Sequence, residues 1–175
     1  MRNQKGFTLI ELIIVIVVLG ILAVTAAPQF FNFSGDARES AVKGLKGNIQ
    51  GAYQTVYAKA AIEGKLGDSD TLNEDTTSTD DDIALVYGYP AATDDGIGKA
   101  SNLDSQDWDI LAVSGTSGAA NKYYVSPEGY TQPATSGDPL AESDYTSGNC
   151  YAVYSETSSA DAAPVVTAET SGCGN

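Results

Sequence analysis

The feature that most constrains this chain is an uncharged apolar run near its start. Residues 12–35 contain no charged side chain, and the segment LIIVIVVLGILAVTAA within them is long enough to cross the ~30 Å hydrocarbon core of a bilayer as a helix. Residues 1–10 contain Arg2 and Lys5 but no Asp or Glu. Because positive residues tend to stay on the cytoplasmic side, we expect the rest of the chain to cross the membrane.

Glu11 is the unusual residue of this region, because it places a carboxylate inside an apolar stretch that starts at Phe7. A charge in hydrocarbon costs at least ~2.5 kcal/mol, so the position indicates a partner. A cleavable secretory signal would end at a small-residue site, which residues 23–27 imitate, but neither such a signal nor a simple anchor tolerates Glu11 cheaply. A single-pass anchor with a tolerated Glu remains the alternative.

Beyond the apolar run the pattern predicts an amphipathic helix. Apolar residues recur at three- and four-residue steps at Val42, Leu45, Ile49, Ala52, Val56 and Ala60. Joined to the apolar run, they predict one helix from Phe7 to about Ile62, of about 55 residues and about 80 Å.

Glycine and proline mark two parts of this expected helix. Gly20 and Pro28 predict a kink or a helix break. Gly44, Gly47 and Gly51 lie roughly opposite the apolar stripe. They either let a neighbouring helix approach closely or merely loosen a surface helix.

The remainder of the chain predicts a small α+β body. Residues 64–107 are rich in Asp, Thr, Ser and Gly, and we expect an exposed excursion there rather than core. Strand-like runs follow at residues 109–113, 122–125, 151–155 and 165–168, and they predict an antiparallel sheet of about four strands wrapped on the long helix.

Composition excludes several functions. Nine Lys and Arg oppose 23 Asp and Glu, which is too acidic for a nucleic-acid partner. The chain has no His, GxSxG, P-loop or dinucleotide motif, so we expect neither an enzyme nor a bound cofactor. Acidic clusters lack the spacing of a calcium loop and favour a solvated surface over a calcium site; they are Asp68/Asp70, residues 80–82, Asp94/Asp95 and Asp104/Asp107/Asp109.

Two cysteines, Cys150 and Cys173, lie near the C-terminus of a chain that is sent across a membrane. This context favours a disulfide, which would stabilise the body by ~3 kcal/mol in the chain-entropy model. Two free buried thiols are the alternative. With no His, no third Cys and no CxxC, a metal site is disfavoured.

The N-terminal segment KGFTLIELIIVIVVLGILAVTAAPQF, residues 5–30, resembles the signal of type IV pilins, in which a short basic leader ends in glycine. The resemblance implies cleavage between Gly6 and Phe7 by a prepilin peptidase that also methylates the Phe7 amine. It implies that Glu11 pairs with the N-terminal amine of a neighbouring subunit. It also implies a helix that is continuous or gently bent in the free subunit and can lose helicity between Gly20 and Pro28 on assembly.

The resemblance also implies a type IV pilin fold, with a long N-terminal helix packed on the C-terminal sheet. Its expected divisions are a leader (1–6), a transmembrane and filament-core half of the helix (7–30), an amphipathic half (31–63), an acidic surface loop region (64–107) and a sheet with a disulfide-bounded end (108–175). The subunit would wait in the inner membrane with a periplasmic body, and the assembly machinery would then polymerise it into an extracellular homopolymer.

Further segments are similar to the mannose-sensitive haemagglutinin pilins, namely TAAPQFFNFSGDAR, GLKG at 44–47 and YAKAAIEGK at 57–65. This similarity implies a major pilin used for surface adhesion and biofilm formation. The alternatives are a minor pilin or a type II secretion pseudopilin, and a membrane-anchored binding module that never polymerises.

Overall fold

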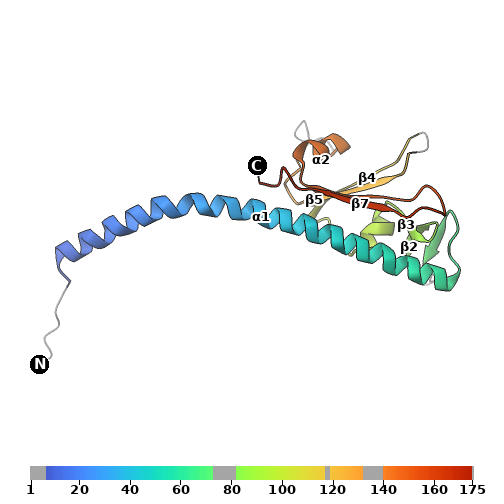
Figure 1. Ribbon diagram of the computed structural model, residues 1–175, viewed down its shortest axis with the longest axis horizontal. Coiled ribbons are helices and arrows are strands. Elements are labelled where there is room, and N and C mark those ends of the chain that lie inside the picture. The colour runs from blue at the N-terminus through green and yellow to red at the C-terminus, as the bar shows by residue number, and fades with distance from the viewer. Residues whose placement is uncertain (1–6, 73–81, 117–118, 132–139, 175) are drawn as a thin grey trace, which may run out of the picture.

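The computed structural model describes residues 7–72, 82–116, 119–131 and 140–174, and only the backbone of residues 25–32 inside the long helix. One helix, α1 (Leu9–Glu63), extends well beyond a small body that packs along its C-terminal half (Figure 1). Its 55 residues match the predicted helix in length and position.

Helix α1 has well-formed caps at both ends. Thr8 is the N-cap, with extended backbone at φ −84° and ψ 153°. Gly64 ends the helix in the left-handed conformation at φ 73°, where its N–H reaches Ala60 O and Ala61 O. Glycine adopts this conformation without the steric cost that a Cβ would add.

Gly20 and Pro28 do not interrupt α1 in the single chain. The helix is continuous across both positions, and Figure 1 shows that its axis is gently curved. Since Pro28 has no N–H to donate to the preceding turn, this is an intrinsically weak point in the helix. Loss of helicity there on assembly stays a prediction.

The C-terminal half of α1 packs on the body through the predicted stripe. Val42, Leu45, Ile49, Val56 and Ala60 are buried, whereas Ala52 is only half-buried. The 3.6-residue period of α1 is what directs these side chains to one side.

The first part of this stripe, Val42 to Ile49, packs on a four-stranded antiparallel sheet, as predicted. Its order follows the sequence: β4 (Trp108–Val113), β5 (Lys122–Pro127), β6 (Tyr151–Ser155) and β7 (Val165–Glu169). Tyr123, Val125, Ala152, Tyr154 and Val166 point from the sheet into the main core, where they meet Val42, Leu45 and Ile49.

Residues 64–107 are more structured than predicted. They contain a three-stranded antiparallel sheet of β1 (Asp70–Leu72), β2 (Ile83–Val86) and β3 (Tyr89–Pro90), followed by a π-helical turn, η1 (Asp94–Gly98). Leu72 and Leu85 are buried against Val56 and Ala60 of α1 and form a second core cluster. The expectation of an exposed excursion was therefore wrong for these strands, because short apolar islands suffice when a helix already covers them.

Cys150 and Cys173 form the predicted disulfide, with a sequence separation of 23. A short helix that the sequence did not indicate, α2 (Glu142–Gly148), precedes Cys150 and contributes the buried Tyr145. The Tyr145 ring lies 5.7 Å from that of Tyr124, centroid to centroid. Helix α2 therefore covers the face of the sheet that α1 does not.

Replacing Ile49 by Ala tests the packing of α1 on the sheet. Because Ile49 is 0% exposed, Ile49→Ala should lower the free energy of unfolding by ~2–5 kcal/mol, measured by urea denaturation of the full-length chain in detergent. Ile62→Ala is the matched control on the same helix: Ile62 is 87% exposed, so the change should stay within ~0.5 kcal/mol. Equal losses in the two variants would contradict this packing.

Candidate functional site

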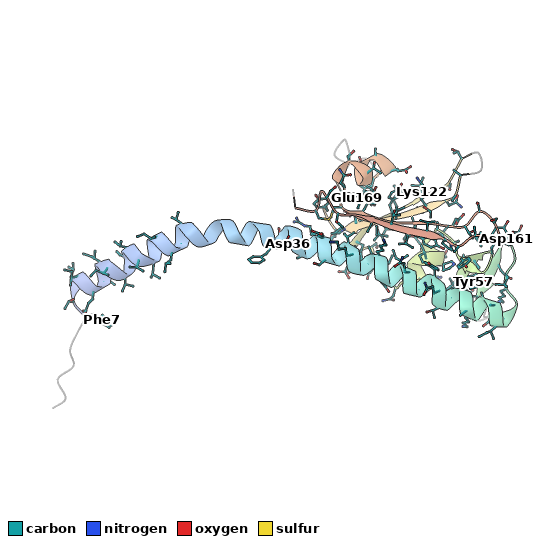
Figure 2. The ribbon with its side chains drawn as sticks, viewed as in Figure 1. Phe7, Asp36, Tyr57, Lys122, Asp161 and Glu169 are labelled. Atoms are coloured by element: carbon teal, nitrogen blue, oxygen red, sulfur yellow. A yellow bond between two sulfur atoms is a disulfide. The ribbon has the colours of Figure 1, made fainter. Side chains whose placement is uncertain are left out.

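The N-terminal half of α1 presents apolar side chains on all sides. Every large apolar residue from Phe7 to Val24 is between 46% and 93% exposed. In Figure 2 these side chains project from the part of α1 that extends beyond the body, and Phe7 lies at its far end. A helix that is apolar all round is stable only when something else covers it.

Within the residues that the structure describes, no helix is long and apolar enough to qualify as a membrane span.

Thr8 and Glu11 form a capping box at the start of α1. The N–H and the hydroxyl of Thr8 both donate to Glu11 Oε2, each at 2.8 Å, and the N–H of Glu11 donates to Thr8 Oγ1 at 3.3 Å. The Glu11 carboxylate, which the sequence marks as unusual, thus has a local role, because it accepts a hydrogen bond from the backbone N–H of Thr8 at the helix start. The signal for Thr8, a T-x-x-E pattern before an apolar run, was present in the sequence.

The sequence-predicted site residues fall into two groups in space. Phe7 and Glu11 lie together at the tip of α1, whereas Cys150 and Cys173 lie at the body; Gly6 falls outside the described residues. No described contact joins the two groups, so any chemistry of the tip depends on molecules other than this chain's own body.

Gly44, Gly47 and Gly51 lie on the exposed side of α1, as their phase predicts. A methyl group added at any of them would meet no atom within 4 Å. This part of the helix surface is therefore bare backbone that another helix could approach closely.

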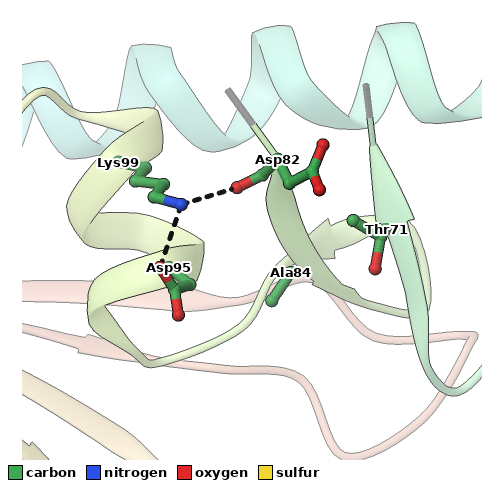
Figure 3. A pocket seen from close by; sticks show the side chains of 5 residues that line it. All are labelled: Thr71, Asp82, Ala84, Asp95 and Lys99. Atoms are coloured by element: carbon green, nitrogen blue, oxygen red, sulfur yellow. Dashed lines mark hydrogen bonds and ion pairs between the residues drawn. The ribbon is translucent and has the colours of Figure 1, made fainter. Parts of the chain in front are cut away.

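A small hollow lies between β1, β2 and η1 and has a volume of about 310 Å³ (Figure 3). Thr71, Asp82, Ala84, Asp95 and Lys99 line it. Lys99 Nζ lies 3.0 Å from Asp95 Oδ1 and donates to the main-chain oxygen of Asp82 at 3.3 Å. Among the described residues, no group of three or more acidic, His or Cys side chains is placed to hold a metal ion.

On the outer face of the sheet, a cluster of three polar side chains joins β5 to α2. Tyr124 OH donates to Glu142 Oε1 at 2.5 Å, and Lys122 Nζ lies 3.1 Å from the same oxygen. The hydrogen bond from Tyr124, followed by that from Lys122, lowers the pKa of Glu142. Hydrogen bonding to Glu142 is also the main cause that raises the pKa of Lys122.

Comparison with known proteins identifies the family. The family model described as the prokaryotic N-terminal methylation motif matches residues 1–27. The chain is 37% identical over 117 residues to a fimbrial protein of Pseudomonas aeruginosa, a match that covers 65% of this chain and 69% of that one. It is 32% identical over 149 residues to a fimbrial protein of Moraxella nonliquefaciens, covering 72% and 97% respectively.

A third relative is the type IV major fimbrial protein FimA of Dichelobacter nodosus, 33% identical over 103 residues, which are 53% of this chain and 66% of the relative. No solved structure matches the chain. The motif at the helix start, the helix-on-sheet fold and these relatives together define the class: the chain belongs to the type IV pilin family. It is a structural subunit of pili and not an enzyme.

The cluster of Lys122, Tyr124 and Glu142 predicts a pH dependence at α2. Because the folded-state pKa of Glu142 lies below its ordinary value of 4.5, its contribution to stability is complete above that pH and is lost as the pH falls through the lowered pKa. We expect Tyr124→Phe to raise the pKa of Glu142 more than Lys122→Gln does, measured by NMR titration of the Glu142 carboxyl carbon. The reverse order would show that the ammonium, not the phenol, holds the pKa down.

Proposed function

We propose that this chain is the major subunit of an attachment pilus similar to the mannose-sensitive haemagglutinin pilus. The observation that carries the proposal is the exposed apolar segment of α1 from Phe7 to Val24, which its own body leaves uncovered. A membrane covers it first, and the helices of neighbouring copies cover it after assembly. The body then remains outside the filament core and forms the pilus surface.

Before assembly, the proposed subunit spans the inner membrane once. The uncharged residues 12–35 provide the apolar length, and Arg2 and Lys5 hold the leader in the cytoplasm. The body is then periplasmic, the oxidising side on which the bond between Cys150 and Cys173 forms and persists.

Processing is proposed to occur at the junction of Gly6 and Phe7. A prepilin peptidase removes residues 1–6 and methylates the new amine of Phe7. The match of residues 1–27 to the N-terminal methylation motif supports this step. The three bonds of the Thr8–Glu11 capping box all lie after the junction, so removal of the leader does not break them.

Glu11 is proposed to pair with the Phe7 amine of a neighbouring subunit. Both capping bonds to its carboxylate end on Oε2, so Oε1 is the oxygen that an incoming amine would approach. Thr8 thereby orients the carboxylate. In an apolar bundle the ion pair removes much of the cost of the isolated charge, and it also fixes the register between subunits.

Two features of α1 suit packing in a filament. The bare backbone at Gly44, Gly47 and Gly51 allows close helix approach, and the stretch from Gly20 to Pro28 is where helicity is proposed to be lost. The adhesive and biofilm roles rest on the segments of α1 that resemble the mannose-sensitive haemagglutinin pilins, and the role as major subunit is supported by a relative that is a major fimbrial protein.

Mass spectrometry of sheared surface fibres tests the proposed identity. A major pilin dominates the fibres, begins at N-methylated Phe7 and carries the disulfide. Presence at low copy number would assign the chain to the minor pilins or pseudopilins instead. An intact leader, or absence from the fibres, would contradict polymerisation and leave a membrane-anchored module.

Glu11→Gln and Thr8→Val separate the ion pair from the helix cap. Glutamine can still accept the capping bonds but has no charge, so Glu11→Gln should reduce surface fibres by at least about tenfold if the amine pairing drives docking. Thr8→Val removes the cap and keeps the charge, and we expect it to retain more fibre. Fibre yield is measured by shearing, with the subunit level in the membrane as control. Loss of fibres in Thr8→Val alone would show that the cap is the essential feature.

A further inference from the structure

The C-terminal end of the chain returns to α1 at the point where the helix leaves the body. Gly35 is buried, whereas Phe33, Ser34, Asp36 and Ala37 around it are exposed. A methyl group added at Gly35 would lie 2.6 Å from Gly174 Cα, so the two backbones are in direct contact. This contact requires a glycine at position 35, whereas a methyl group added at Gly174 would meet nothing within 4 Å.

Arg38, one turn further along α1, holds the same end of the chain. Its Nη1 donates to the main-chain oxygen of Cys173 at 3.3 Å. Its guanidinium carbon lies 5.4 Å from the ring centroid of Tyr130, and the hydroxyl of Tyr130 donates to Gly172 O. The arginine thus binds the C-terminal loop by a charge-assisted hydrogen bond and by contact with an aromatic face.

The loop that Arg38 grips is itself fixed to the sheet. The disulfide joins Cys173 to Cys150 immediately before β6, and the N–H of Gly172 donates to Asn149 O at 2.8 Å. A pull on the helix at Gly35 or Arg38 is therefore transmitted to the four-stranded sheet. We call Gly35, Arg38, Tyr130, Gly174 and the disulfide the clasp.

The clasp holds two turns of helix that the sheet does not reach. The next buried residue after Gly35 is Val42, the first residue of the stripe in the main core. Residues 36–41 between them are exposed or half-buried. Without the clasp, the body's hold on α1 would begin at Val42.

We propose that Arg38 and Gly35 are positioning residues, and that through the clasp they make the attachment of α1 to the body begin at Gly35 instead of at Val42. The clasp keeps residues 35–41 helical and attached, so that unwinding that starts between Gly20 and Pro28 stops before it enters the body. This consequence for unwinding rests on the proposed function, because unwinding between Gly20 and Pro28 is proposed to occur during filament assembly. The clasp itself belongs to the single subunit and is testable without a filament.

Hydrogen exchange of the oxidised full-length subunit in detergent micelles tests the proposal. In Arg38→Gln and Gly35→Ala, amides of residues 35–41 should exchange at least about tenfold faster, while those of residues 42–60 keep their protection. Gly35→Ala is informative because alanine favours a helix more than glycine does, so faster exchange can come only from the displaced Gly174.

Two control variants match these changes. Gly44→Ala makes the same substitution where the added methyl meets nothing within 4 Å, and Lys46→Gln removes the same charge from the same helix. Both should leave the exchange of residues 35–41 unchanged. Reduction of the disulfide should reproduce the effect of Arg38→Gln at residues 35–41.

Three results would overturn the clasp. The first is unchanged exchange of residues 35–41 in both clasp variants. The second is an equal increase over residues 42–60, which would indicate a loosened body. The third is the same increase in the control variants. None of these results depends on fibre formation, so the clasp can fail while the proposed pilus function stands, and the reverse also holds.

Discussion

The structure depends on the burial of one apolar stripe of α1 by the sheet. Val42, Leu45 and Ile49 meet Tyr123, Val125 and Tyr154 in the main core, and this contact is what converts a long helix and a meander of strands into one molecule. The same helix carries a second apolar surface, from Phe7 to Val24, that has no counterpart in the body. One continuous element therefore carries one apolar surface that the body covers and one that the body leaves exposed.

The two halves of α1 differ in how their apolar side chains are arranged around the helix. The body-facing half buries a stripe and leaves its other sides polar or bare, so its orientation is fixed. The free half is apolar all round, so burial alone gives it no preferred rotation or depth. Directional interactions are needed for that, and the described directional groups at its tip are the hydroxyl of Thr8 and the carboxylate of Glu11. The capping box gives the Glu11 carboxylate a defined orientation at that tip.

Sequence reasoning predicted the long helix because its apolar pattern is long and periodic, and the four main strands because each is a run of strand-forming residues between turn-forming segments. Residues 151–155 were predicted with the bounds of β6 itself, and α1 was placed to within two residues. Strands β1 to β3 were missed because they are only two to four residues long, and η1 and α2 were missed because each is polar apart from a single large side chain, Ile97 and Tyr145. Thr8 was readable from its motif. Arg38 was not, since its partner Cys173 lies 135 positions away and only the fold brings them together.

The packing of α1 along the body has a mechanical consequence. A load applied along the axis of α1 would run parallel to the interface between α1 and the sheets that it packs on. The interface would then be loaded in shear, so the side chains from Val42 to Ala60 would resist together instead of separating one after another. The clasp carries part of the same load to the sheet, because the bond from Arg38 to Cys173 and the disulfide join that end of the interface to the start of β6. A subunit of this kind therefore resists tension through the whole contact between helix and body instead of through one residue.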